Sequence, residues 1–297
     1  MQFHSLYELD ICFDRRALNY PDGRRKAQLF GALIPPNCHS VLDVGGGTGW
    51  TTITMRDKYW ITTLDLSLPS LIKGYGDRVR ANAVNLPFPD RSFDVLLCSQ
   101  LLEHIPKEAL LRVKQEICRI ATKALIISVP YRENLKIGMV RCKYCNKVFH
   151  TSYHVRSFSE QDLATFFTGW TLAEWHVFGA LSSTVGLASI RNPAGILRKA
   201  KLPFADQYTI CPYCNRQGES HDRNQGNVNQ SGIHSFIEVF ISPARKMLKL
   251  VKKAAYKSKR FIPQEKIPYW IAAIYLPFGH DTAVDSVIET KIAKDRS

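Results

Sequence analysis

The stretch Val41-Leu42-Asp43-Val44-Gly45-Gly46-Gly47-Thr48-Gly49 decides the fold. An apolar run with an acidic residue is followed by Gly45, Gly46, Gly47 and, after Thr48, Gly49, and a helix-like segment, 50–58, comes next. Such a turn needs backbone that takes positive φ and lies close to a ligand, which glycine permits. The spacing is G-x-G-x-G, because Trp50 stands where a dinucleotide-binding fingerprint needs its third glycine. Nor is there the G-K-[ST] of a phosphate-binding P-loop. We therefore expect a ligand-binding turn between a strand and a helix.

Short apolar runs recur on both sides of this turn. Strands are expected at 40–44, 59–66, 93–99, 124–130, about 170–179 and 268–277. The first four are continuous rather than alternating, as in strands that are buried on both faces. Helices are expected over 107–123, which has apolar residues at helical spacing, and over 158–168, with Ser159 as N-cap. This alternation predicts an α/β fold with a doubly wound, mostly parallel sheet.

The composition is that of a folded protein. The chain has 297 residues, of which 45% are hydrophobic and 22% charged, and its formal net charge is +14. These values exclude disordered, collagen-like and coiled-coil chains. No apolar run reaches about 18 residues, so no transmembrane helix is expected. The N-terminus lacks a signal-peptide pattern, and we expect a reducing, cytoplasmic location.

The expected organisation is a core with insertions. Residues 1–35 form an N-terminal helical segment, and 36–180 plus 266–280 form the core. Residues 132–156 and 181–265 are insertions, which form a small metal-binding lobe and a basic helix. A connection as long as the second insertion needs structure of its own.

Two C-x-x-C pairs predict a metal site. Each pair, Cys142/Cys145 and Cys211/Cys214, is followed by Asn, which tolerates the left-handed conformation that closes a zinc knuckle. Four thiolates are the ligand set of a closed, structural Zn²⁺ site. A local site of Cys142, Cys145, His150 and His154 is an alternative, as are a catalytic zinc and unliganded pairs.

Asp65 ends the strand that follows the glycine turn. In a parallel sheet its carboxylate lies at the same edge as that turn, where acidic residues bind ribose hydroxyls. The alternative is an ordinary N-cap or turn residue.

These motifs together resemble the class I S-adenosylmethionine-dependent methyltransferases. The likeness is carried by VLDVGGGTG (41–49), Asp65 and ANAVNLPFPDRSFDVLLCSQLLEHI (81–105). It is greatest for the branch with the type 11 methyltransferase core that includes the ubiquinone/menaquinone-biosynthesis enzymes. It spans about 25–180 and returns at 268–277. The resemblance implies a Rossmann-like fold and S-adenosylmethionine as cofactor, but it says little about the methyl acceptor.

The resemblance also implies a set of cofactor-binding residues. The glycine turn would pass beneath the methionine and ribose parts, Asp65 would hold the ribose diol, and Asn82 would face the adenine. Asn82 stands where the family usually has Asp, but its amide oxygen still accepts a hydrogen bond. The full set is Asp43, Gly45, Gly46, Gly47, Gly49, Asp65, Leu66, Asn82, Ala83, Ser99 and Gln100.

Histidines are the candidate catalytic residues. A hydroxyl acceptor would benefit from a general base, and His104, just past the strand at 93–99, is one candidate. A packing role for His104 is the alternative. The segment 131–160 also resembles an insertion in methyltransferases of bacterial surface-polysaccharide clusters. That likeness implies that His150, His154 and Arg156 lie near the acceptor. Apart from it, His150 and His154 are further candidates for the general base, and His154 is the second catalytic residue that we expect.

The segment 245–260 is strongly basic. It holds Lys and Arg without an acidic residue, and Met247, Leu250, Val251 and Ala254 fall on one helical face. Such a helix suits an anionic membrane surface, an acidic substrate or RNA. The alternative is a solvated face of a packed helix.

We therefore expect an S-adenosylmethionine-dependent methyltransferase that acts on a saccharide, a lipid-linked glycan or a small metabolite. Peripheral contact with an anionic membrane is expected, and nucleic acid is the less favoured partner. The first alternative is an RNA methyltransferase, but the chain lacks the N/D-P-P-[YF] tetrapeptide of base methylation. The second alternative is a non-catalytic, zinc-stabilised scaffold. The sequence leaves the acceptor atom and the oligomeric state open.

Overall fold

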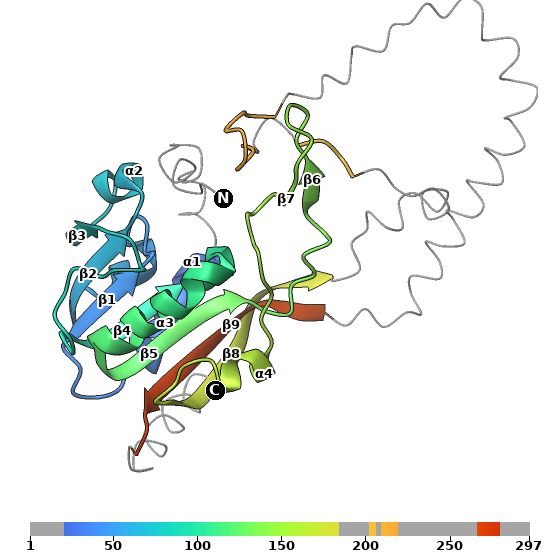
Figure 1. Ribbon diagram of the computed structural model, residues 1–297. Helices are drawn as coiled ribbons and strands as arrows, with labels where there is room; N and C mark the ends of the chain where they lie inside the picture. Colours follow the sequence, from blue (N-terminus) through green and yellow to red (C-terminus); the bar gives the residue numbers. More distant parts are fainter. Residues whose placement is uncertain (1–20, 184–201, 206–208, 219–265, 280–297) are drawn as a thin grey trace, which may run out of the picture.

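A seven-stranded sheet organises the chain. The computed structural model describes residues 21–183, 202–205, 209–218 and 266–279, and the sheet order is β3-β2-β1-β4-β5-β9-β8 (Figure 1). The strands are β1 (Ser40–Val44), β2 (Trp60–Asp65), β3 (Asp77–Arg80), β4 (Phe93–Ser99), β5 (Ala121–Pro130), β8 (Trp170–Ser183) and β9 (Lys266–Pro277). Strands β1 to β5 are parallel, and β9 runs antiparallel to both β5 and β8.

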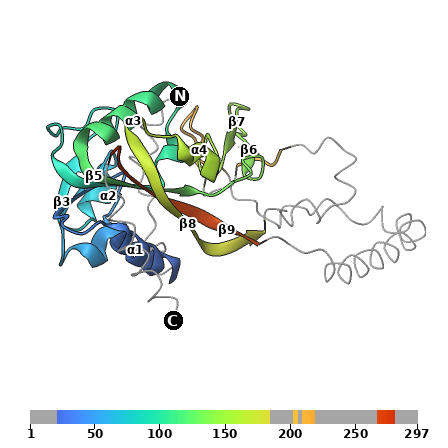
Figure 2. The same cartoon turned by 90° about the horizontal axis from the view of Figure 1, so that it is seen from below.

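Helices cover both faces of the sheet. Figure 2 shows α1 (Pro21–Leu33) on one face and α3 (Lys107–Ile120) and α4 (Glu160–Ala164) on the other. Each face has its own buried apolar cluster, one including Phe30 and Val95 and the other including Ile117 and Tyr275. Burial on both faces explains the continuous apolar runs of the central strands. The predicted α/β, doubly wound, mostly parallel sheet is confirmed.

The chain reverses its direction of travel across the sheet next to β1. From β1 it moves outward to β2 and β3, and it then returns to place β4 on the other side of β1. In open α/β sheets, ligands bind outside the carboxyl ends of the strands at such a switch point. The turns that follow β1 and β4 therefore flank the expected ligand position.

Several predicted elements differ from the structure in extent. The helix expected over 50–58 is a short 3-10 helix, η4 (Trp50–Met55), and the helix expected over 158–168 is only α4. Ser159 does cap α4, in a capping box with Asp162. The edge strand β3 is absent from the sequence prediction, because its sequence, DRVR, is polar and its side chains are mostly exposed. The short helix α2 (Leu68–Ile72) lies between β2 and β3.

The ion pair of Glu116 and Arg119 on α3 anchors the loop before β4. Glu116 accepts the backbone N–H of Leu86 at 2.7 Å and pairs with Arg119 at 2.8 Å. Arg119 in turn donates to the carbonyls of Leu86 and Phe88. The Leu-Pro-Phe motif at 86–88 is therefore held to α3 by buried and half-buried hydrogen bonds.

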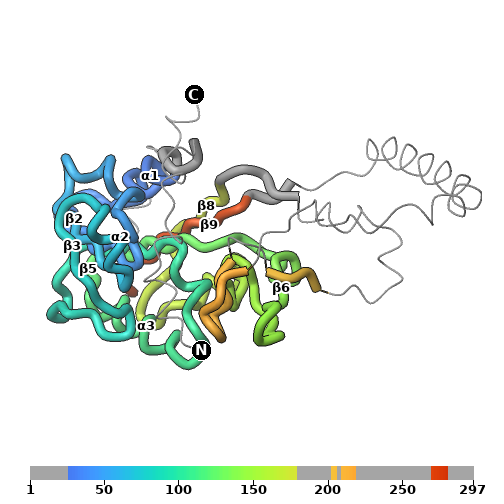
Figure 3. Tube along the Cα trace, turned by 90° about the horizontal axis from the view of Figure 1, so that it is seen from above, coloured from blue at the N-terminus to red at the C-terminus, as the bar shows by residue number. Residues whose placement is uncertain are grey.

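A small lobe stands beyond the carboxyl ends of β4 and β5. It consists of the hairpin β6 (Met139–Arg141) and β7 (Val148–His150) together with segments 202–205 and 209–218. The two segments are drawn in orange in Figure 3, beside the hairpin. An isolated bridge between Arg141 on β6 and Phe204 joins the hairpin to segment 202–205. The division into domains predicted from the sequence stays a prediction, and residues 1–20, most of 181–265 and the basic segment 245–260 lie outside the described residues.

Within the described part of the chain, no helix is both long and apolar enough to cross a membrane.

Glu116→Gln should destabilise the fold by about 1–3 kcal/mol at neutral pH, because a buried charge-assisted hydrogen-bond network is broken. Arg119 holds the pKa of Glu116 below its ordinary 4.5. A lowered pKa stabilises the fold above that value, and this contribution is lost as the pH falls through the folded pKa. The gap between the wild type and the variant, measured by urea unfolding, should therefore narrow below about pH 4.5.

Glu108→Gln, at an exposed position in the first turn of the same helix, serves as the control. It should change stability by less than about 1 kcal/mol. An equal loss in both variants would contradict the anchoring role of Glu116.

Candidate functional site

The glycine turn after β1 has the backbone geometry that its sequence predicts. Gly45, Gly47 and Gly49 have φ of 73°, 57° and 70°, which other residues adopt only at a cost. The N–H groups of Gly45 and Gly46 donate to the carbonyl of Leu64 on β2, at 2.7 and 3.2 Å. The turn therefore lies tightly against the end of the neighbouring strand.

Asp65 holds the turn from the next strand. Its Oδ2 accepts the Gly47 N–H at 2.8 Å, and its Oδ1 accepts the Ser67 N–H at 2.8 Å. Burial raises the pKa of Asp65 above its ordinary value, and these N–H groups offset only part of the rise. Each carboxylate oxygen keeps a further lone pair for a ligand.

Space is open in front of Gly47. A Cβ built there would meet only Asp65 Oδ2, at 4.0 Å, whereas a Cβ on Gly46 would come within 2.5 Å of Asp43. The Gly47 side of the turn therefore faces an open space beside a carboxylate, and the Gly46 side faces the protein interior.

Asp43 is a buried acid with unused hydrogen-bonding capacity. Its side chain is 0% exposed, Thr52 Oγ1 donates to Oδ2 at 3.3 Å, and Oδ1 has no partner among the described residues. Burial raises the pKa of Asp43 to about 7. A bound cation near this carboxylate would stabilise its charged form.

The far side of the switch point is formed by Ser99 and Gln100. Gln100 has a φ of 59°, which is uncommon for a residue other than glycine and marks a position held by its surroundings. Its side-chain oxygen accepts the indole N–H of Trp270 at 3.1 Å. Ser99 Oγ and Gln100 Nε2 are buried and lack partners among the described residues.

Asn82 and Ala83 follow β3, at the same edge of the sheet. The register places Arg80 beside Asp65, and the Ala81 N–H donates to the carbonyl of Asp65. Asn82 Oδ1 accepts the N–H of Val84 at 3.1 Å, which leaves one lone pair. Ala83 is part of the buried apolar core. The carbonyl of Leu66 accepts a hydrogen bond from Arg80 Nε.

These groups fit S-adenosylmethionine. The ligand carries a ribose diol, which suits Asp65, and two cationic groups, which suit the buried carboxylate of Asp43. Open space at Gly47 and unpaired polar atoms at Asp43, Ser99 and Gln100 lie on both sides of the switch point. The predicted cofactor residues are thus gathered at one edge of the sheet.

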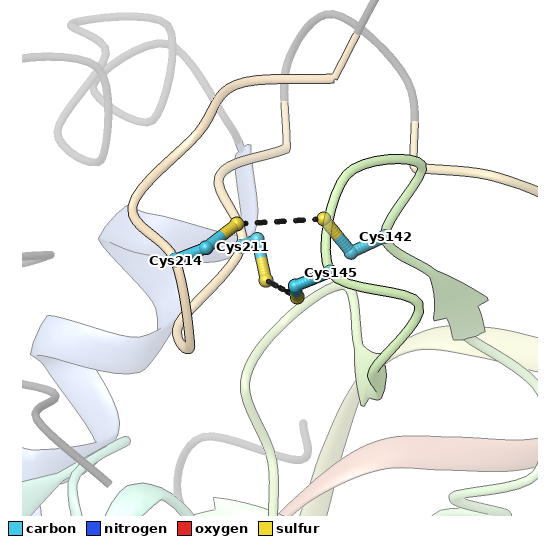
Figure 4. A group of neighbouring side chains, drawn as sticks. All are labelled: Cys142, Cys145, Cys211 and Cys214. Carbon is cyan, nitrogen blue, oxygen red and sulfur yellow. Dashed lines mark hydrogen bonds between the residues drawn. The ribbon is translucent and has the colours of Figure 1, made fainter.

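The four paired cysteines meet in the lobe, as Figure 4 shows. The sulfur of Cys142 lies 3.6 Å from that of Cys214, and Cys145 lies 3.5 Å from Cys211. All four sulfurs lie within 4.8 Å of one another. With Zn–S bonds of about 2.3 Å, a tetrahedral site has sulfurs about 3.8 Å apart, so the cluster fits a metal of this kind.

Both C-x-x-C turns have the same backbone. Asn146 and Asn215 have φ of 59° and 56°, and their N–H groups donate to the carbonyls of Cys142 and Cys211. Burial opposes ionisation of Cys142, but the N–H groups of Cys145 and Tyr144 lower its pKa to about 7. The left-handed Asn expected from the sequence is confirmed at both positions.

His150 and His154 lie apart from the thiolates, in a cluster with Glu133. His154 Nδ1 is 2.5 Å from Glu133 Oε2, and the two imidazole rings stack with centroids 5.3 Å apart. This placement disfavours the alternative Cys142/Cys145/His150/His154 site. The His104 ring packs edge-on against His154, at 4.8 Å.

Sequence reasoning misses two carboxylates of this region. Glu103 lies in the Leu-Glu-His motif without a predicted role, although it is 0% exposed. Glu133 follows β5 and holds His154. A charged residue between two apolar leucines and a histidine is the only sequence signal for Glu103, and Glu133 has none.

Part of the chain is similar to known proteins. Residues 42–124 match a family model described as a methyltransferase domain. The chain is 31% identical over 136 residues to the ubiquinone/menaquinone biosynthesis C-methyltransferase UbiE of Hahella chejuensis, covering 40% of this chain and 50% of that protein. An uncharacterized protein of Methanocaldococcus jannaschii is 31% identical over 123 residues, covering 40% and 52%. The chain thus spans about half the length of these curated relatives.

Solved structures are similar at lower identity. An S-adenosylmethionine-dependent methyltransferase from Archaeoglobus fulgidus has a TM-score of 0.48 and 14% identity, with 92% of this chain and 99% of that chain covered. The protein YcgJ of Bacillus subtilis has a TM-score of 0.42 and 17% identity, with 52% and 73% covered. The strand order and the glycine turn show a Rossmann-like fold, and residues 42–124 of this fold match the methyltransferase-domain model.

Proposed function

We propose that this protein is an S-adenosylmethionine-dependent methyltransferase that acts on a saccharide, a lipid-linked glycan or a small metabolite. One observation carries the proposal: the Gly47 N–H and the Asp65 carboxylate meet at 2.8 Å beside open space, at the switch point of the sheet. Nucleotide ligands of open α/β sheets bind at this place. The family match over 42–124 supports the same function.

The residues of the site bind and orient rather than form bonds. When bound, S-adenosylmethionine supplies an electrophilic methyl group. Asp65 would accept the ribose hydroxyls, and Asp43 would face the cationic end. Ser99 and Gln100 would line the side from which the acceptor approaches. Proximity and alignment of two reactants lower the barrier by about 7–11 kcal/mol in well-oriented systems.

We propose structural zinc at Cys142, Cys145, Cys211 and Cys214. The sulfur separations of 3.5 and 3.6 Å and the two matching turns support it. The ion would join the β6–β7 hairpin to segment 209–218, two parts of the chain that are far apart in sequence. The lobe stands next to the carboxyl end of β4, so it would form part of the acceptor site.

Peripheral contact with an anionic membrane is proposed from the basic segment 245–260, which lies outside the described residues. A membrane-borne acceptor would be consistent with the lipid-linked glycan in the proposal. Labelled methyl transfer to separated glycolipid, polysaccharide, RNA and small-metabolite fractions would identify the acceptor. Transfer to RNA alone, with steep salt dependence, would contradict the proposed acceptor class.

Asp65→Ala should lower the affinity for S-adenosylmethionine by about 10- to 100-fold, because hydrogen bonds to a charged group are lost. Isothermal titration calorimetry measures the change, with thermal unfolding as a check on the fold. Asp77→Ala, at the start of β3, is a matched control since that carboxylate bonds Trp60 instead. Unchanged affinity in Asp65→Ala would refute the ribose contact.

Gly47→Ala should also weaken binding, because its methyl group enters the open space beside Asp65. Gly169→Ala is the matched control, since Gly169 has a φ of 82° and a Cβ added to it would meet no atom within 4 Å. Both variants should lose about 1–2 kcal/mol of stability from the left-handed backbone. Only Gly47→Ala should lose cofactor affinity by calorimetry, and an equal loss in both would count against the pocket.

Cys142→Ser should lose the thiolate metal and destabilise the lobe, because structural zinc is coupled to folding. Cobalt-substituted protein should show thiolate-to-metal charge-transfer absorption, and the variant should not. Cys118→Ser, on α3 and outside the cluster, is the control and should keep the band. A retained band in Cys142→Ser would exclude the four-thiolate site.

A further inference from the structure

The side chains of Glu103, His104 and His154 converge at the carboxyl end of β4. Glu103 and His104 belong to η5 (Leu102–His104), and His154 comes from the insertion that carries the first knuckle. One donor atom from each of the three lies within 4.8 Å of the other two. The backbone joins the same two segments, because the Val155 N–H donates to the carbonyl of Glu103 at 2.8 Å. The convergence is therefore fixed by main-chain bonds as well as by side-chain packing.

Glu103 carries a buried carboxylate. Its side chain is 0% exposed, and neither carboxylate oxygen has a hydrogen-bond partner among the described residues. Burial raises the pKa of Glu103. An unsatisfied buried carboxylate is costly, and such groups in proteins are paired or bind metals.

Each of the two histidines uses one ring nitrogen for a hydrogen bond and has its second ring nitrogen left for a metal. His104 bonds the backbone of Tyr153, while its Nδ1 is buried and has no partner among the described residues. His154 uses Nδ1 for Glu133, so Nε2 is its remaining nitrogen. Metal-binding histidines almost always donate their second ring N–H to a carboxylate or a backbone carbonyl. Both rings follow this pattern.

His150 is close but has the wrong tautomer. Its Nδ1 accepts the N–H of Ser152 at 3.2 Å, so the proton of a neutral ring is on Nε2. Nε2, which lies 3.9 Å from Glu133, then has no lone pair for a metal. The second candidate group, Glu133, His150 and His154, is therefore disfavoured.

We propose that Glu103, His104 and His154 bind a divalent transition-metal ion. Two imidazole nitrogens and one carboxylate suit Zn²⁺, Fe²⁺, Mn²⁺ and Co²⁺ and leave further coordination positions open. Glu133 and the Tyr153 backbone are the positioning groups, which hold the two rings. Lys26 and Arg156 also face Glu103, but Arg156 donates to the Leu102 carbonyl and neither cation bonds the carboxylate.

The open positions give the site a ligand class. Resting on the proposed methyltransferase function, we assign them to a hydroxyl or carboxylate oxygen of the acceptor, since Gln100 and Glu103 are near neighbours in the chain after β4. A metal ion holds and polarises such an oxygen. This would favour an oxygen-bearing acceptor over an amine.

The test is cobalt binding to the zinc-loaded full chain, without cofactor or acceptor. Equilibrium dialysis should give about one equivalent of Co²⁺ with an absorption spectrum that lacks thiolate charge transfer. Glu103→Gln and His154→Gln should each weaken binding at least about tenfold. His150→Gln is the matched control and should bind Co²⁺ as the wild type does.

Three results would overturn the site: no cobalt bound, cobalt that appears only with thiolate charge transfer, or an equal loss in His150→Gln and His154→Gln. Thermal unfolding of each variant shows that the fold is kept, and two independent ligand variants guard against one that misfolds. S-adenosylmethionine affinity is measured on the same samples. Failure of the metal site with intact cofactor affinity would leave the proposed function standing.

Discussion

The hydrogen bond from the Gly47 N–H to the Asp65 carboxylate is the contact on which the site depends. It ties the end of β1 to the end of β2 at 2.8 Å and fixes a turn that only glycine adopts without strain. The Ser67 N–H holds the other carboxylate oxygen, so Asp65 is oriented before any ligand arrives. Preorganised groups of this kind bind with less loss of entropy.

The lobe extends the same edge of the sheet. The cysteine cluster joins the β6–β7 hairpin to segment 209–218, and the chain between β7 and α4 returns to the end of β4. His154 is thereby carried from the lobe to Glu103 and His104. A structural metal at the thiolates would thus stabilise the segment that carries His154 to Glu103 and His104. The thiolate site and this second site share no ligand.

The sheet and the turn could be predicted from sequence because both depend on local signals. Continuous apolar runs identify β1, β2, β4 and β5, and the glycines at 45, 47 and 49 indicate positive φ. Strand β3 could not be predicted, because an exposed edge strand lacks the apolar pattern by which strands are recognised in a sequence. The meeting of the two C-x-x-C turns was predictable from their repeated form. The cluster around Glu103 was not, because Glu133, His154 and Glu103 come together only through long-range folding.

The separation of the two C-x-x-C turns also has a consequence for how the chain matures on the ribosome. Cys142 and Cys145 emerge well before Cys211 and Cys214, and β8 emerges well before its partner β9. Contacts between distant parts of a chain form slowly, because closing the loop between them costs entropy before the stabilising contacts are made. The thiols of Cys142 and Cys145 therefore have no partner thiols until residues 211–214 are synthesised. Nascent protein would be most exposed to oxidation and to the wrong metal during that interval.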